Sequence, residues 1–352
     1  MRTSLRVLSI IALLASCTKT PDGGVAFYIN PGIEEPYTRS VIEGSSFRLK
    51  DSYGLFIYYS EENTPMTEFI PYGYGHTDKY NNIKSYKRVD GSWEYTLHGS
   101  LNAVKDFFMI EPSVSGRSGL AVCAYSPWTK EASSIREIPF SVGGVYSDII
   151  DLMWASQNME GDNLHIIPKG KTETIRLTFK HALTNFRLGF KCDYEGTSIK
   201  ISSVKIRKAG ETELYSGGVF DAVNAMYPSL TPVEEIVFDC TTNSSSNDYR
   251  FDSSGYYYLS LLLVPVEYLN DGDYIIEFTF NGIELSTSYA IRLNDASRYD
   301  ISGENGVEGQ KYAFVQGKSY TFEFDFDNYA QISNVSIDVA DTWEQEEHRL
   351  DF

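Results

Sequence analysis

Residues of the types that perform catalysis are present in this chain, but their spacing does not match a catalytic or metal-binding motif. The histidines are His76, His98, His165, His181 and His348. No HExxH sequence occurs, so the pattern that places two zinc-binding histidines on one helix face is missing. His181 ends a predicted strand, where a hydrogen-bonded structural role is the simpler interpretation. We therefore expect a non-enzymatic protein without catalytic residues, metal site or cofactor.

Acidic residues dominate the charge of the chain. Forty-eight Asp and Glu against 30 Lys and Arg give a formal net charge of −18 at pH 7. Such a surface repels nucleic acid, because the phosphate backbone carries the same sign, and we expect no nucleic-acid partner. Acidic pairs such as Glu61-Glu62 are more simply solvated surface residues than a glycosidase dyad. Two interpretations stay open for the aromatic side chains of Tyr72, Tyr74 and Trp128. They either stack on sugar rings or pack within loops.

The cysteine with a clear chemical role is Cys17, which follows a short export segment. Arg2 and Arg6 precede an apolar stretch that is too short to span a bilayer. The sequence Leu14-Ala15-Ser16-Cys17 resembles a bacterial lipobox, in which a peptidase cuts before the cysteine and the thiol receives a diacylglyceryl group. Two or more acyl chains such as palmitate hold stably in a membrane, so Cys17 is predicted to tether the chain to outer-membrane lipid. The alternative is an ordinary signal peptide with a cysteine near its cleavage site.

The three later cysteines are interpreted as structural residues. Cys123, Cys192 and Cys240 show neither CxxC nor zinc-ligand spacing. Each lies in a strand-like sequence, where a buried thiol packs as a small apolar side chain. A disulfide between Cys192 and Cys240 stays open, because an oxidising compartment would permit it.

The elements that position these residues are predicted to be β-strands. Twenty-six Tyr and 20 Phe against six Met favour strands over helices. Apolar and polar residues alternate with a period of two, which is typical of strands with one buried face. The clearest runs lie within 53–59, 120–125, 175–179, 186–192, 274–280, 320–326 and 335–339. Many short strands with regular turns predict an all-β fold of antiparallel sandwiches.

Turn sequences predict how some of these strands connect. Asn281-Gly282 between two alternating runs is a strong β-hairpin pattern, and Asp90-Gly91 predicts a second hairpin. A change of phase at Ser202-Ser203 predicts a β-bulge. The segment from Leu101 to Phe108 is interpreted as one short helix, and residues 241–255 are interpreted as a polar surface loop.

The length of the chain and one turn-forming sequence predict two domains. A chain of 352 residues is long enough to bury two separate cores. Pro168-Lys169-Gly170-Lys171 immediately precedes the most regular strand of the second half. We therefore place the boundary between residues 168 and 169.

Four further segments of the sequence follow the lipobox in a fixed order. After the lipobox come Tyr37-Thr38-Arg39-Ser40, Asp151 to Ala155, Ile175 to Leu183 and Gly317 to Phe322. In this order, and over nearly the whole chain, they resemble the fimbrillin family, the major and minor fimbrial subunits (type V pilins) of gut and oral Bacteroidetes-type bacteria. The segment from Leu177 to Leu183 is the most specific part of the resemblance.

The resemblance implies two tandem transthyretin-like β-sandwich domains and a lipoprotein precursor that is carried to the outer membrane. It also implies that a trypsin-like protease removes an N-terminal strand, after which a strand of the next subunit fills the groove. The candidate residues are Val25, Ala26, Phe27, Tyr28 and Ile29 in the removable strand, Arg39 and Ser40 at the cleavage site, and Val335, Ile337 and Val339 in a donor or groove strand. The expected parts are a signal peptide (1–16), a lipidated segment with the removable strand (17–39), an N-terminal domain (40–168) and a C-terminal domain (169–352).

Two functions are expected from these features. The first is a structural and adhesive subunit of a cell-surface fimbrium, with partners that include other fimbrial subunits, the maturation protease, and receptors or glycans on host or bacterial surfaces. An open strand edge is a template for pairing with another chain, which supports this interpretation independently of the resemblance. The alternative is a non-polymerising outer-membrane lipoprotein that binds glycans.

Overall fold

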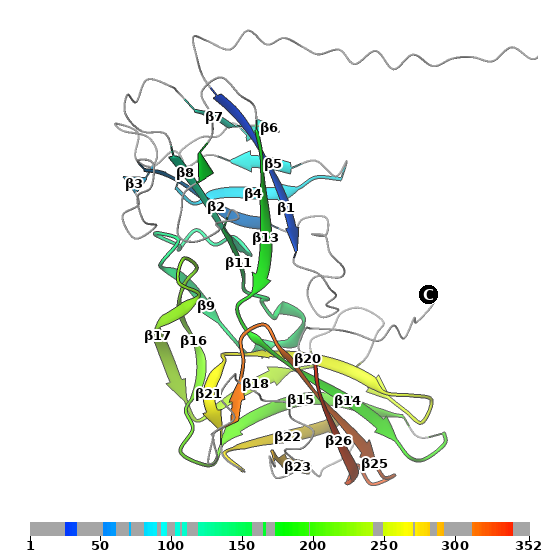
Figure 1. Ribbon diagram of the computed structural model, residues 1–352. Helices are drawn as coiled ribbons and strands as arrows, with labels where there is room; N and C mark the ends of the chain where they lie inside the picture. Colours follow the sequence, from blue (N-terminus) through cyan, green and yellow to red (C-terminus); the bar gives the residue numbers. More distant parts are fainter. Residues whose placement is uncertain are drawn as a thin grey trace, which may run out of the picture.

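The chain folds almost entirely into β-strands, which confirms the predicted all-β class. The computed structural model describes residues 25–33, 52–60, 70–71, 81–89, 93–96, 103–105, 108–110, 119–156, 165–166, 173–196, 198–241, 249–269, 272–281, 287–291 and 312–340. Within these residues one short 3-10 helix, η2 (Tyr146–Asp148), interrupts the strands. Figure 1 shows two groups of strands, one above the other.

The upper group in Figure 1 is a sheet of eleven strands. Its strands are β1 (Val25–Ile33), β2 (Ser52–Ser60), β3 (Ile70–Pro71), β4 (Ile83–Lys87), β5 (Trp93–Thr96), β6 (Ala103–Lys105), β7 (Phe108–Ile110), β8 (Gly119–Ser126), β11 (Met153–Ser156), β12 (His165–Ile166) and β13 (Glu173–His181). The main path runs β6-β5-β4-β2-β8-β11-β13-β1-β7, with β3 beside β2 and β12 beside β8.

This sheet curls back on itself to enclose a core. The rings of Tyr53 in β2 and Phe179 in β13 lie 5.6 Å apart, although β8 and β11 separate these strands in the sheet. Neighbouring strands are about 4.8 Å apart, so three steps across a flat sheet would separate the rings by roughly 14 Å. Trp93 lies 4.8 Å from Tyr53 and completes the aromatic contact.

The lower group forms a sandwich of two main sheets and two small ones. Its strands are β9 (Ile138–Ser141), β10 (Gly144–Val145), β14 (Thr184–Cys192), β15 (Ile199–Lys208), β16 (Leu214–Asp221), β17 (Met226–Val233), β18 (Glu235–Asp239), β19 (Arg250–Phe251), β20 (Tyr257–Leu263), β21 (Val266–Leu269), β22 (Tyr274–Asn281), β23 (Thr287–Ala290), β24 (Tyr312–Phe314), β25 (Ser319–Phe326) and β26 (Ile332–Ala340). The main sheets run β10-β18-β15-β22-β23, with β19 beside β15, and β20-β14-β25-β26. The small sheets are β17-β16-β9 and β21-β24.

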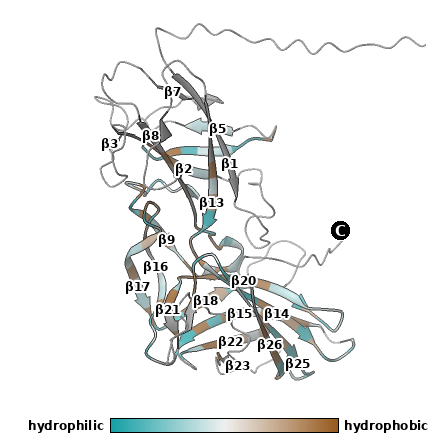
Figure 2. Cartoon of the chain, viewed as in Figure 1, coloured by the Kyte–Doolittle hydropathy of each residue, from teal (hydrophilic) through white to brown (hydrophobic). Residues whose placement is uncertain are grey.

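Phenylalanine side chains fill the space between the two main sheets. Phe190 of β14 is fully buried and its ring lies 5.3 Å from Phe278 of the opposite sheet. Phe278 in turn lies 4.9 Å from Phe324 of β25. Apolar and polar residues alternate along these strands (Figure 2), so each strand presents its apolar side to this core.

A second cluster of buried side chains joins the two groups of strands. It contains Phe56 and Tyr125 from the upper sheet together with Phe220 and Leu262 from the lower group. The chain also crosses between the groups more than once, since β9 pairs with β16 and β10 with β18. The boundary proposed at residue 168 stays a prediction, and strands on both sides of it contribute to each group.

Several local predictions are confirmed. The Asp90-Gly91 hairpin joins β4 and β5, and the β-bulge lies between Ile201 and Ser203 of β15. The second hairpin joins β22 and β23. It pairs Phe278 with Thr287, whereas a two-residue turn at Asn281-Gly282 would pair Phe278 with Leu285, so the connection is longer than predicted.

Two local predictions are wrong. Residues 103–105 and Phe108, expected in one helix over 101–108, lie in strands β6 and β7, because pairing with β5 and β1 overrides the local preference. Tyr249 and Phe251, expected in a polar surface loop, are buried, and Phe251 pairs with Ile199. The sheets are also mixed, since β1–β13, β10–β18 and β14–β25 are parallel pairs.

Replacing Phe190 with alanine should destabilise the sandwich strongly. The Phe190 ring contacts four other phenylalanine rings, so truncation leaves a cavity with an expected cost of about 3–5 kcal/mol. Urea unfolding followed by tyrosine and tryptophan fluorescence measures this loss. Tyr329→Ala, at a side chain that is 69% exposed, is the control and should change stability by less than about 0.5 kcal/mol.

Candidate functional site

Strand β1 lies between two other strands and is the partner that both of them share. It pairs in parallel with β13, from Phe27 opposite Glu173 to Ile33 opposite Phe179. It pairs in antiparallel fashion with β7, from Val25 opposite Ile110 to Phe27 opposite Phe108. Figure 1 shows β1 beside the long β13 at one margin of the upper sheet. The predicted removable strand, Val25 to Ile29, lies within β1.

Neither neighbour of β1 has another strand beside it over the same residues, as far as the described part of the chain extends. The other partner of β13, β11, pairs only with Lys180 and His181 at the end of β13. Strand β7 pairs only with β1. Removing β1 would therefore leave two strand edges with unpaired backbone N–H and C=O groups, which act as a template for a new strand.

The sequence of β1 fits a strand that can be exchanged. Valine, phenylalanine, tyrosine and isoleucine in Val25–Ile29 favour extended backbone. Pro31 lacks a backbone N–H and would weaken a strand that pairs on both sides. It lies opposite Leu177 and beyond the three residues that pair with β7, so β13 is its only described neighbour. The proline is tolerated because only one side of β1 is paired there.

Strand β13 presents apolar side chains to the core next to β1. Leu177 is 1% exposed and Phe179 is fully buried, while Lys180 is exposed. The contact of Phe179 with Tyr53 ties this strand to the opposite wall of the core. A strand that replaces β1 would therefore join an edge whose own side chains are already held in place.

The end of β13 is fixed by a largely buried hydrogen bond between side chains. His181 Nδ1 lies 2.9 Å from Asp151 Oδ1, and the Asp151 side chain is fully buried. The neighbouring amide of Ala182 donates to the Leu152 carbonyl at 2.8 Å. His181 thus makes the hydrogen bond expected of a structural histidine. No group of three or more His, Cys, Asp or Glu within the described ranges could hold a metal ion.

The other residues predicted for strand exchange have different outcomes. Cys17, Arg39 and Ser40 lie outside the described residues. Val335 and Ile337 lie in β26, opposite Phe324 and Phe322 of β25, and pack against the sandwich core. Val339 belongs to the same strand, opposite Tyr320. Because β26 pairs only with β25 in the described part of the chain, it forms an edge of its sheet.

The aromatic residues considered for sugar stacking give one correction. Trp128 is half-buried, packs against the second core cluster and donates from Nε1 to the Asn82 carbonyl at 3.3 Å. The Lys84 ammonium lies over its ring at 4.7 Å. Trp128 therefore packs within the fold and is not the exposed platform that was considered. Tyr72 and Tyr74 lie outside the described residues.

The three later cysteines are free and buried, as predicted for structural residues. Burial raises the pKa of the Cys123 and Cys240 thiols to about 12. A raised pKa keeps a thiol protonated near neutral pH, and the protonated form is a poor nucleophile. Cys123 and Cys240 are therefore inert packing residues.

Sequence reasoning missed strand β7 and the parallel pairing of β1. The apolar run from Phe107 to Ile110 was a signal for a strand, but its first two residues were included in the expected helix, which ended at Phe108. The parallel register depends on residues 140 or more positions apart, and no local pattern encodes it.

No helix in the described part of the chain is long and apolar enough to cross a membrane.

The profile of the fimbrillin-like family matches residues 38–341, and the chain belongs to this family. A candidate cell adhesion protein from Bacteroides uniformis is 14% identical, with a TM-score of 0.54 over 92% of this chain and 99% of its own. A fimbrial protein from Bacteroides vulgatus is 16% identical, with a TM-score of 0.52 over 92% of this chain and 100% of its own. These two likenesses show a shared fold. No match was found among curated protein sequences.

The buried thiols should be unreactive in the folded protein. With Cys17→Ser in the full chain, we expect Cys123 and Cys240 to react very slowly with DTNB at pH 8, because only about 1 in 10,000 of such thiols is ionised there. Denaturant should release all three thiols. Tyr329→Cys places a thiol at an exposed position and should react at once. Native thiols that react as fast as this control would contradict the burial.

Proposed function

We propose that this protein is a structural and adhesive subunit of a cell-surface fimbrium, assembled by removal of β1 and exchange of strands between subunits. The observation that carries the proposal is the position of β1 between β13 and β7. Membership of the fimbrillin-like family supports it. The folds shared with a candidate cell adhesion protein and a fimbrial protein are consistent with it.

Backbone pairing supplies the driving force for this assembly. An intramolecular hydrogen bond contributes about 0.5–1.5 kcal/mol net, and a buried group left unpaired costs about 1–3 kcal/mol. Seven residues of β1 lie opposite β13 and three lie opposite β7, so loss of β1 creates many such groups. A strand from a neighbouring subunit restores the hydrogen bonds and fills the pockets for alternate side chains.

Strand β26 is the proposed contribution of the chain to a neighbour. Its outer edge has no partner in the described part of the chain, and Val335, Ile337 and Val339 alternate along it. Because β26 pairs with β25 along nearly its whole length, we propose that it stays in its own sheet and offers its open edge to a strand of a neighbouring subunit.

Cleavage after Arg39 should convert the monomer into polymers. A trypsin-like protease is expected to yield a chain that begins at Ser40 and then forms a ladder of oligomers on native and mildly denaturing gels. Arg39→Gln should remain monomeric, whereas Arg48→Gln should behave as the unchanged chain does. N-terminal sequencing of the product checks the cleavage position.

A synthetic peptide of residues 25–33 provides a sharper control. It should reoccupy the slot between β13 and β7 and stop the ladder, while a scrambled peptide of the same composition should have no effect. A cleaved chain that stays monomeric without the peptide, or polymerises equally with it, would refute exchange at β1. A different N-terminal residue would change only the cleavage position.

Cys17 should determine attachment to the outer membrane. Export as a lipoprotein requires the thiol, so Cys17→Ser should move the full chain from the outer-membrane fraction to the soluble fraction. Labelling with a radioactive fatty acid should be lost in the same variant. Ala15→Gly keeps a small residue before the cysteine and is the matched control. Persistent labelling of Cys17→Ser would contradict lipidation at this position.

A further inference from the structure

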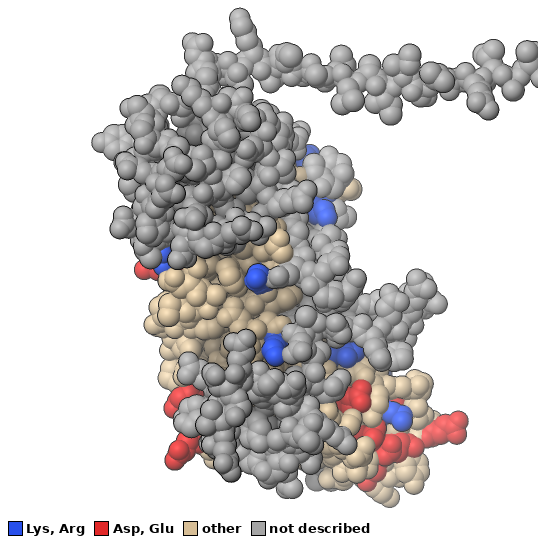
Figure 3. Space-filling model, in the orientation of Figure 1, with Lys and Arg blue, Asp and Glu red and all other residues tan. Residues whose placement is uncertain are grey.

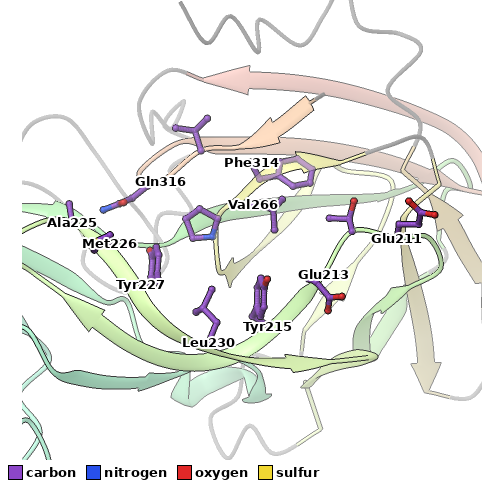
Figure 4. A pocket seen from close by; sticks show the side chains of 13 residues that line it. Glu211, Glu213, Tyr215, Ala225, Met226, Tyr227, Leu230, Val266, Phe314 and Gln316 are labelled. Atoms are coloured by element: carbon purple, nitrogen blue, oxygen red, sulfur yellow. The ribbon is translucent and has the colours of Figure 1, made fainter. Parts of the chain in front are cut away.

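A groove of about 830 Å³ lies in the lower group of strands, far along the chain from β1. The β16–β17 hairpin supplies one wall, with Tyr215, Tyr227 and Leu230. Val266 of β21 and Phe314 of β24 face them across the groove (Figure 4). Its volume is within the usual range for ligand sites.

The two ends of the groove differ in chemistry. Glu211 and Glu213 lie at one end, and Gln316 and Met226 lie at the other (Figure 4). Between them the walls are aliphatic and aromatic. No Lys, Arg or His occurs among the described residues that line it. Lys208, beside the groove, pairs with Glu213 at 3.3 Å, so the groove combines an apolar body with an acidic end at which Glu211 supplies the excess negative charge.

Hydrogen bonds hold the polar ends in place. Thr212 donates to the Asp273 carboxylate, and Tyr274 donates to the Glu213 carbonyl at 2.5 Å. The Gln316 side chain donates to the Ala225 carbonyl at 3.3 Å and accepts from the indole of Trp154 at 3.2 Å. A ligand therefore meets walls that need little rearrangement, which reduces the entropic cost of binding.

This chemistry selects among possible occupants. A fatty acid would bring a third carboxylate to the end with Glu211 and Glu213. An oligosaccharide needs hydrogen-bond partners along its length, but Thr212 and Gln316 are already bonded and the middle is apolar. A chain with apolar side chains and one positive charge satisfies both features.

We propose that the groove binds an extended peptide of a partner protein in which aliphatic or aromatic residues adjoin a lysine or arginine. The apolar side chains pack between the β16–β17 hairpin and the β21–β24 pair, and the basic side chain meets Glu211, because Glu213 already pairs with Lys208 at 3.3 Å. The net charge of −18 attracts such a segment at long range. The face shown in Figure 3 carries scattered Lys and Arg side chains on and beside an uncharged surface, and its acidic side chains gather mainly toward the lower end.

This binding is independent of strand exchange. The strands that line the groove, β16, β17, β21 and β24, pair with neither β1 nor β13. The site therefore exists in the unprocessed monomer, and its test does not require polymerisation. Failure of peptide binding and failure of assembly are separate results.

The test uses the purified full chain as an unprocessed monomer. On an array of random hexapeptides, we expect enrichment of aliphatic and aromatic residues next to Lys or Arg. Fluorescence polarisation then compares Leu-Tyr-Val-Leu-Val-Arg with the same peptide ending in Glu, which should bind at least about tenfold more weakly. An array without selection, or equal affinity for the two peptides, overturns the proposal.

Two pairs of variants locate the binding site. Met226→Asp places a carboxylate on the apolar wall and should weaken binding about tenfold, while Val237→Asp, at a similarly accessible position outside the groove, should not. Glu211→Lys should weaken binding of the peptide that ends in Arg and strengthen binding of the peptide that ends in Glu. Glu234→Lys should change the affinity for neither peptide. A thermal stability equal to that of the unchanged chain confirms that each variant is folded. Binding unaffected by Met226→Asp, or binding of a neutral glycan that Met226→Asp abolishes, overturns the peptide assignment.

Discussion

The hydrogen-bonded ladder on each side of β1 is the interaction on which the proposed assembly depends. A β-strand satisfies its backbone groups only through neighbours, and β1 is the described neighbour of both β7 and most of β13. The same nine residues therefore close two edges at once. Loss of such a strand leaves exposed edges that pair with whatever extended chain is present. In the proposed assembly, removal by proteolysis and replacement by a neighbour are coupled for this physical reason.

The rest of the fold is arranged so that loss of β1 has local effects. The sandwich core of the lower strands is built from side chains such as Phe190, Phe278 and Phe324, and none of its strands pairs with β1. The last residues of β13 are held by β11, by the His181–Asp151 pair and by the Ala182 amide. The open edge would therefore remain attached to a folded body. A subunit of this kind can wait for a partner strand without unfolding.

The sequence predicted the strands better than it predicted their partners. Alternation in 274–280 and 320–326 located β22 and β25, because a strand with one buried face carries that pattern in its own residues. The segment 101–108 was misread as a helix, because β6 and β7 are only three residues long and exist through pairing with distant strands. The removable strand was proposed from a resemblance, and its position between β13 and β7 depends on contacts that no local pattern records. The groove at Tyr215 and Phe314 was not predicted for the same reason.

The negative net charge limits how two copies of this chain can associate. Each carries a formal net charge of −18, so two copies repel one another unless short-range contacts outweigh that repulsion. Backbone ladders and buried apolar side chains are such contacts, since both act at van der Waals distance and neither depends on net charge. The same acidity favours basic partners at the groove near Glu211. In the two proposals, association between identical subunits and capture of an unlike partner thus rely on different forces, so neither interaction would displace the other.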